Sequence, residues 1–212
     1  MNRTATTPLL ALALVASAAA SAVAAVPSAA NSTLPPCMVL CPMGDLPFIV
    51  VVRDFANNPI AGSTVVLDFS DCPNGAYICP QPPPDPYAVN YVARTLSRLT
   101  DGAGRATFVA RLGGTGPAGC VSVSADGVVL RTYALASPDQ DGDGQVVSVI
   151  GTDDPRFAAK LGSSDPTADF DCDGYVDSYD EQIFFYHHSH ACEGFVDPVR
   201  HRSWGSLKLH YR

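Results

Sequence analysis

The sequence predicts a mainly β chain, in which an antiparallel β-sandwich is followed by a small α-helical segment. Two observations support this prediction. Between residues 45 and 136, short β-branched runs alternate with turn signals, as expected for a sandwich of short strands. Over residues 137–196 the composition changes to aspartate-rich loops, each followed by a short helical pattern.

Residues 1–25 have the order of a secretory signal peptide. Arg3 precedes an apolar run at residues 9–16, and small residues follow, with candidate cleavage points after Ala24 or Ala25. A transmembrane anchor is the alternative, but the run is only about half of the roughly 20 apolar residues that a span needs. We therefore expect no membrane span and a protein that is secreted or held at the cell surface. Residues 26–44 form a lead-in to the sandwich.

The expected strands of the sandwich are residues 48–52, 63–69, 96–99, 105–112, 120–124 and 128–134. Asp-Gly or Gly-Gly pairs at residues 101–102, 113–114 and 126–127 mark turns between the later strands. Residues 72–91 are rich in proline, which cannot donate a ladder hydrogen bond. This stretch is predicted to be an irregular loop.

Two stretches of this region resemble bacterial invasin-type Ig-like domains. Residues 52–62, VRDFANNPIAG, are similar to the family's V-x-D-x-x-G-N-P-V-x-G stretch, and residues 100–107, TDGAGRAT, to its T-D-x-x-G-x-A turn. Asn57 replaces a glycine of the family pattern, and asparagine also tolerates the left-handed conformation. The resemblance implies an Ig-like fold over residues 45–136. Both motifs are turns, so they imply no activity.

The charge distribution argues against a nucleic-acid partner. The formal net charge is −8, and twelve of the 21 acidic residues lie between Asp139 and Glu181, where Arg156 and Lys160 are the only basic residues. Such a block repels itself and a phosphate backbone unless cations neutralise it. A bound cation is therefore expected in this segment.

Residues 169–180 have the spacing of an EF-type calcium loop. Calcium takes six to eight oxygens, which such a loop supplies from positions 1, 3, 5, 7, 9 and 12. The predicted ligands are Asp169, Asp171, Asp173, the Tyr175 carbonyl and Asp180. Gly174 makes the sharp turn, and Asp177 could hold a water molecule. Val176 is expected to pair with its counterpart Val146 in a short β-bridge.

A preceding copy of this loop is less regular. Its predicted ligands for Ca2+ are Asp139, Asp141, Asp143, the Gln145 carbonyl and Asp153. Counting straight to position 12 reaches Ile150, which cannot bind a metal, so Asp153 closes the loop only if residues 147–152 bulge outward. Asp154 is the alternative closing ligand. The loops start at Asp139 and Asp169 and the following helical patterns at Asp153 and Asp180, so the first loop carries three extra residues.

Paired loops that are each followed by one helix resemble dockerin domains, whose pattern is D-x-N/D-x-D-G-x-V-x-x-x-D. The resemblance implies a calcium-dependent dockerin-like fold over residues 137–196 that docks onto a cohesin-like partner in polysaccharide degradation. The partner-reading positions of that family fall on Ser178 and Tyr179 here, and the insertion displaces them in the first loop. A calcium-binding structural or interaction role is therefore the leading hypothesis, and cohesin docking is the alternative.

All seven cysteines follow the signal peptide, which in an exported chain indicates disulfides and at least one unpaired thiol. Cys72 with Cys79 could staple the proline-rich loop. Cys172 and Cys192 bracket the second calcium loop, but a straight helix between them would hold them about 15 Å apart, which is beyond disulfide reach. The other three cysteines are Cys37, Cys41 and Cys120.

Other patterns indicate less specific roles. His187, His188 and His190 suggest zinc, but no Glu or Cys is placed to complete a tetrahedral set. A favourable interaction with a helix C-terminus is the simpler interpretation of these histidines. Residues 197–212 form a basic tail. No nucleophile elbow, glutamate pair or Cys-His motif is apparent, so no enzymatic activity is expected.

Overall fold

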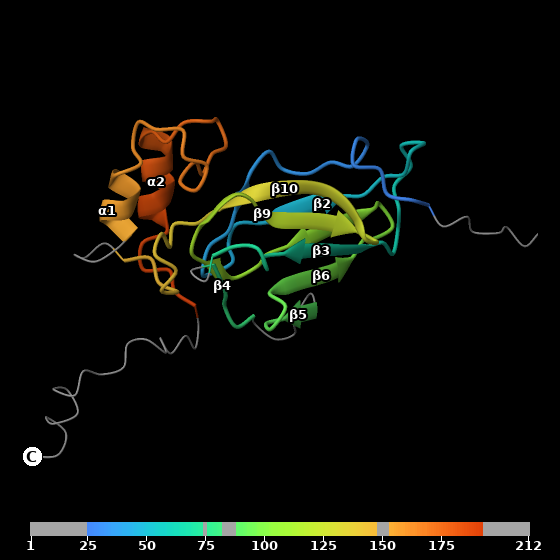
Figure 1. The fold of residues 1–212 in the computed structure, drawn as a ribbon, viewed down its shortest axis with the longest axis horizontal. Helices are drawn as coiled ribbons and strands as arrows, with labels where there is room; N and C mark the ends of the chain where they lie inside the picture. The colour runs from blue at the N-terminus through green and yellow to red at the C-terminus, as the bar shows by residue number, and fades with distance from the viewer. Residues whose placement is uncertain (1–24, 74–75, 82–87, 148–152, 193–212) are drawn as a thin grey trace, which may run out of the picture.

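The computed structural model describes residues 25–73, 76–81, 88–147 and 153–192. The predicted signal peptide and basic tail lie outside this part, except for residue 25. Strands occupy one end of the molecule and two short helices the other (Figure 1). The strands are β1 (Met38–Val39), β2 (Phe48–Val51), β3 (Thr64–Asp68), β4 (Tyr77–Ile78), β5 (Ala88–Asn90), β6 (Thr95–Leu99), β7 (Arg105–Phe108), β8 (Leu112–Gly113), β9 (Gly116–Ala125) and β10 (Val128–Ala136). The helices are α1 (Asp153–Ala158) and α2 (Ser178–Tyr186). The prediction of a mainly β chain is confirmed.

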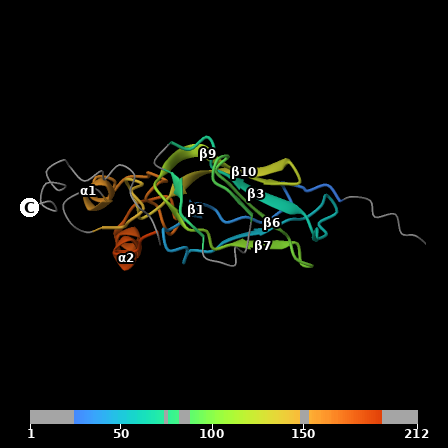
Figure 2. The same cartoon turned by 90° about the horizontal axis from the view of Figure 1, so that it is seen from below.

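The largest sheet has six strands in the order β1-β10-β9-β3-β6-β5, and two smaller sheets pair β2 with β7 and β4 with β8. All the strand pairs are antiparallel except β1 with β10. Alternate residues of β2 and β3 are buried because successive side chains point to opposite faces of a strand. Strand β7 lies on the opposite side of the molecule from β9 and β10 (Figure 2). The side chains between them form one hydrophobic core, to which Phe48, Leu67 and Phe108 contribute.

Aspartates shape two surface turns in the same way. Asp54 Oδ1 accepts hydrogen bonds from the backbone N–H groups of Ala56 and Asn58, and Asn57 between them has φ 65°. Asp101 Oδ1 likewise accepts from the N–H groups of Ala103 and Arg105. An aspartate side chain that accepts hydrogen bonds from nearby backbone N–H groups stabilises a turn without the hydrogen bonds of a regular β-ladder. These are the two turn motifs that the sequence singled out.

Two segments contain strands that were not predicted. The proline-rich stretch was expected to be irregular, but it contributes β4 and β5 to the sheets. The segment predicted as a lead-in contributes β1, and Thr33 pairs with Val51. Strands of two or three residues are too short to show a period-2 pattern, which explains why the sequence did not reveal them. No helix in the described part of the chain is long and apolar enough to cross a membrane.

Six of the seven cysteines lie in pairs at disulfide distance, which are Cys37–Cys172, Cys72–Cys120 and Cys79–Cys192. The expected Cys72–Cys79 staple is wrong. Cys72 follows β3, which is the antiparallel neighbour of β9, and this places it beside Cys120 with 4.6 Å between their Cα atoms. Cys172 and Cys192 do not pair with each other. Each is instead bonded to the β part of the chain, so two covalent links join the helical end to the sheets.

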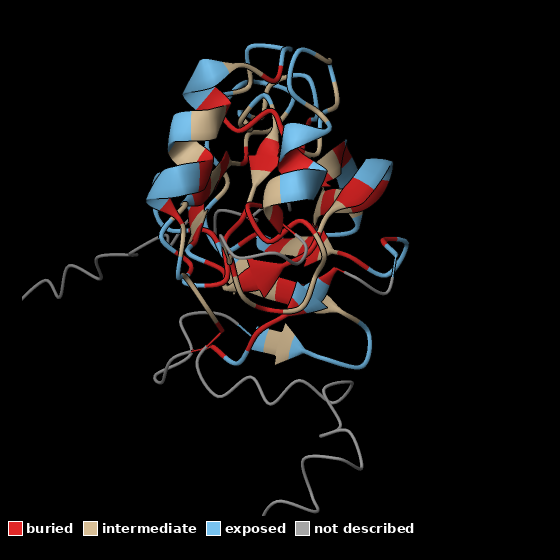
Figure 3. Ribbon diagram, turned by 90° about the vertical axis from the view of Figure 1, so that its left-hand side faces the viewer, coloured by how far each residue is buried: buried red, intermediate tan, exposed pale blue. Residues whose placement is uncertain are grey.

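The helical end has a small core of its own. Phe157 of α1 stacks on Phe184 of α2, with 4.6 Å between ring centroids and 3° between planes, and on Phe170 at 5.7 Å. Val146, Val176 and Ala136 complete the centre of this cluster. Figure 3 shows that both helices carry buried and exposed residues. The cluster holds the two helices against each other and against the end of β10.

Candidate metal centre

The loop over residues 169–180 is organised around its aspartates. Asp169 Oδ2 accepts from the Gly174 N–H at 2.9 Å, and Asp173 Oδ1 accepts from the Tyr175 N–H at 2.9 Å. Asp180 Oδ2 accepts from the Asp177 N–H at 2.8 Å. Gly174 has φ +96°, a conformation that L side chains rarely adopt, so glycine suits the sharp turn at this position.

The loop over residues 139–153 repeats these three hydrogen bonds. Asp139 Oδ2 accepts from the Gly144 N–H at 2.9 Å, and Asp143 Oδ1 accepts from the Gln145 N–H at 2.9 Å. The two loops therefore have matching backbones at the positions of their first, third and fifth residues.

Asp153 closes the first loop in the way that Asp180 closes the second. Its Oδ1 accepts from the N–H groups of Gln140 and Asp141, and its Oδ2 accepts from the Val147 N–H at 3.0 Å. Asp180 Oδ1 accepts from the N–H groups of Phe170 and Asp171, which are the corresponding donors of the second loop. Asp154 is not used in this way, because its Oδ1 lies 3.2 Å from His188 Nε2. Most of the bulge that this closure requires, residues 148–152, lies outside the described residues.

Three carboxylates converge in each loop. In the first, oxygens of Asp139, Asp141 and Asp153 lie within 4.8 Å of one another. Asp169, Asp171 and Asp180 form the equivalent group in the second. Asp143 and Asp173 are not members of these groups, and each of them bonds a backbone N–H of its own loop. The carbonyls of Gln145 and Tyr175 remain predicted ligands.

Two of the three carboxylates of the first group are buried, and the electrostatics of the group favour a cation. Asp139 and Asp153 have no exposed surface. Loss of solvation, and then the neighbouring Asp153 charge, raise the pKa of Asp139 to about 8. Loss of solvation raises the pKa of Asp153 to about 6. Gly113 leaves room for this group, because a Cβ there would collide with Asp139 Oδ2.

The expected bridge between Val146 and Val176 is wrong. The Val146 N–H donates to the His190 carbonyl, and the Val176 N–H donates to the Ser163 carbonyl. Each loop therefore bonds the segment that follows the other loop's helix. This crossed arrangement satisfies both buried valines and brings residues 189–190 back toward the first loop.

The closing aspartates also connect the loops to the helices. Asp153 is the first residue of α1, and Asp180 lies in the first turn of α2. Asp177, which was predicted to hold a water molecule, caps α2 by accepting from the Tyr179 N–H at 2.7 Å. Carboxylates in the first turn also interact favourably with the positive end of the helix dipole.

The donor set fits calcium better than a softer metal. Every side chain in the two groups offers carboxylate oxygen, and hard cations such as calcium prefer this donor. Burial of like charges in the first group is unfavourable without a cation. Comparison with family models, with curated proteins and with solved structures finds no match for this chain.

Proposed function

We propose that the protein is an exported calcium-binding protein with a structural or interaction role, in which Ca2+ folds the C-terminal module. The observation that carries this proposal is the repeated closure of each loop by a fully buried aspartate, Asp153 and Asp180. An ion held by such a loop would fix the start of the helix that carries the closing aspartate. Calcium would thus stabilise the packing of α1 against α2.

The proposal includes the architecture that the sequence resembles: an Ig-like sandwich followed by a dockerin-like pair of loops. Sheets that share one core, with aspartate turns at residues 54 and 101, support the first part. The matching hydrogen bonds of the two loops support the second. We assign no enzymatic activity to this architecture. Export, with a secreted or cell-surface location, rests on the pattern of residues 1–25.

Calcium titration of the exported chain, beginning at residue 26 and with its disulfides intact, tests this proposal. An isolated segment 137–196 is unsuitable, because Cys172 and Cys192 would lose their partners. Calorimetry should detect two calcium ions. Asp139→Ala and Asp169→Ala should each abolish one of them, because each removes the first ligand of its loop.

Asp71→Ala is the matched control, because it removes an exposed carboxylate outside both loops. It should leave the two bound ions unchanged. If the unaltered chain showed neither calcium heat nor a calcium-dependent change in helix content, the proposed function would be wrong.

The second candidate function is docking onto a cohesin-like partner in polysaccharide degradation. The exposed aromatic face of α2 favours it, since Tyr179 and Tyr186 are 64% and 75% exposed and lie two helical turns apart on one side of the helix. Calorimetry with a panel of cohesin modules would test this alternative. Binding that is lost in a Tyr179→Ala and Tyr186→Ala double variant would support it, and no binding to any cohesin would count against it.

A further inference from the structure

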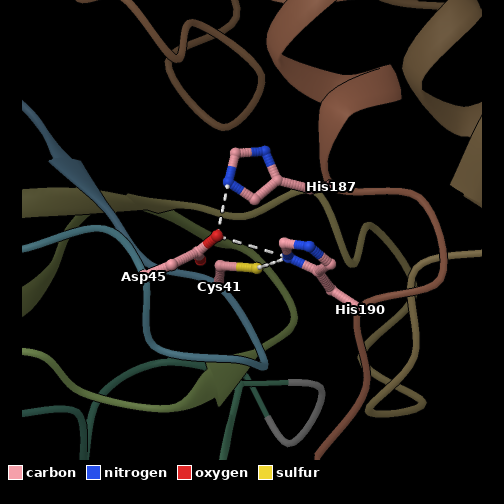
Figure 4. A group of neighbouring side chains, drawn as sticks. All are labelled: Cys41, Asp45, His187 and His190. Atoms are coloured by element: carbon pink, nitrogen blue, oxygen red, sulfur yellow. Dashed lines mark hydrogen bonds and ion pairs between the residues drawn. The ribbon is translucent and has the colours of Figure 1, made fainter.

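A second cluster of potential metal ligands lies where the helical end meets the sheets. It consists of Cys41, Asp45, His187 and His190, and ligand atoms from all four residues lie within 4.8 Å of one another. Figure 4 shows the four side chains pointing toward a common centre. They come from two segments that are far apart in the sequence, and each segment supplies two ligands. The donors are sulfur, oxygen and nitrogen, unlike the all-oxygen groups of the acidic loops.

Three of the six separations between the ligand atoms suit a tetrahedral ion. Cys41 Sγ lies 3.4 Å from His190 Nδ1. Asp45 Oδ2 lies 3.5 Å from His187 Nε2 and 3.5 Å from His190 Nδ1. Atoms at zinc bond lengths of about 2.0–2.3 Å from a tetrahedral centre are about 3.3–3.6 Å from one another. All three separations fall in that range.

Tight turns present both pairs of ligands. The Gly44 N–H donates to the Cys41 carbonyl at 2.9 Å, and Gly44 adopts φ +70°, so the chain turns back and brings Asp45 close to Cys41. In the second segment the His190 N–H donates to the His187 carbonyl at 3.0 Å. The backbone therefore fixes the spacing within each pair.

His187 has the orientation of a metal ligand. Its Nδ1 lies 2.7 Å from the Ile183 carbonyl, which can only accept, so in the neutral imidazole Nδ1 carries the proton and Nε2 carries the lone pair. A carbonyl that fixes the second ring nitrogen in this way is typical of metal-bound histidines. The His187 side chain is 3% exposed, and Nε2 has no hydrogen-bond partner. A bound cation would satisfy this buried lone pair.

A nucleophilic Cys-His-Asp arrangement does not explain the cluster. In such an arrangement the acid orients the imidazole through one ring nitrogen while the other activates the nucleophile. Here both Cys41 and Asp45 approach the same atom, His190 Nδ1. Cys41 is also completely buried, which keeps a substrate from its sulfur.

We infer that Cys41, Asp45, His187 and His190 bind a zinc-like divalent ion that clamps the helical end to the sheets. One thiolate, one carboxylate and two neutral imidazoles give a divalent ion a neutral site, and sulfur and nitrogen donors select zinc over calcium. This assignment gives the unpaired seventh cysteine a role. The sequence shows no complete ligand set around the histidines, because Cys41 and Asp45 lie near the opposite end of the chain.

The site is accessible to an incoming ion. A groove of about 420 Å3, lined in part by Leu46, Phe170 and Tyr186, reaches Asp45 and His187. The Asp45 side chain is 36% exposed. An ion can therefore enter without unfolding of the surrounding core.

Zinc titration of the exported chain, stripped with EDTA and then saturated with calcium, tests the inference. One zinc ion should bind, and Co2+ in its place should give the intense visible absorption of a tetrahedral site with a thiolate charge-transfer band. Cys41→Ser should abolish that band and weaken zinc binding by more than about 100-fold, since even outer-shell partners of such ligands contribute about 10- to 100-fold. Asp45→Asn should weaken zinc binding while the thiolate band remains. If Cys41→Ser misfolds, this second variant still tests the site.

His188→Ala is the matched control, because His188 adjoins the cluster but faces Asp154 instead. It should bind zinc as the unaltered chain does. The zinc and calcium titrations read different ligand sets, so the two proposals can fail separately. Absence of zinc binding, or zinc binding that neither Cys41→Ser nor Asp45→Asn weakens, would overturn the inference.

Discussion

Replacing Phe184 with alanine should destabilise the helical end of the molecule far more than replacing its neighbour Phe185. Phe184 is 1% exposed and stacks on Phe157, whereas Phe185 is 52% exposed. Loss of a buried phenylalanine ring costs about 3–5 kcal/mol, of which ring pairing accounts for about 0.5–1.5 kcal/mol. Phe185→Ala should cost less than about 1 kcal/mol, because its ring is half exposed.

Hydrogen exchange in the native state is the appropriate assay, because it reports the opening of α2 separately from that of the sheets. A loss of about 3–5 kcal/mol corresponds to a fall of roughly 10²- to 10⁴-fold in the protection of the α2 amides. The amides of β9 should change less, since Phe184 is not part of the sheet core. Equal, small effects of the two substitutions on α2 protection would refute the assignment of Phe184 to a separate core.

Two further predictions concern the sheets and the first acidic loop. Gly104→Ala should destabilise the fold by about 2 kcal/mol or more in urea denaturation. Gly104 has φ +71°, a conformation that costs an L residue roughly 1–2 kcal/mol, and a Cβ at this position would also lie 2.6 Å from the Val52 carbonyl oxygen. Gly102→Ala, which meets nothing within 4 Å, is the control, and equal effects of the two would contradict the argument. In EDTA, the melting temperature should decrease as the pH rises from about 4 to about 8. Over this range Asp139 and Asp153, with folded pKa values of about 8 and about 6, retain protons that the unfolded chain has released. Saturating calcium should remove this dependence, and a melting temperature that rises with pH in EDTA would show that the carboxylates of the first loop are not buried as described.

The sequence predicted the features that depend on local chemistry. Alternating and β-branched runs marked β2, β3, β6, β7, β9 and β10 to within a few residues, because burial of one strand face imposes a period of two. The repeat that contains Phe157 and Phe184 predicted both helices, because a buried helix face also imposes a regular spacing of apolar residues. The prediction of Asp153 as the closing residue of the first loop also rested on a local repeat, namely the match between its helix and α2.

Features that depend on distant contacts could not be read in the same way. The partner of Cys72 is Cys120 because β3 and β9 are neighbours in the sheet, and no spacing along the chain encodes that neighbourhood. Val146 bonds residues 189 and 190 rather than Val176 because the two loops cross. His187 and His190 likewise acquire Cys41 and Asp45 only after the helical end has folded back onto the sheets.

The Cys37–Cys172 link also determines how the molecule carries mechanical load. If the chain is pulled between the segment before Cys37 and the segment after Cys192, one covalent route for the tension passes through this bond and bypasses residues 38–171. The backbone on this route is the stretch from Cys172 to Cys192, which contains most of the second acidic loop and α2. Fully extended, that stretch reaches at most about 70 Å. The Cys79–Cys192 link opens a second route through residues 37–79, which include β1 to β4, so the helical end and these strands share the tension while both bonds are intact.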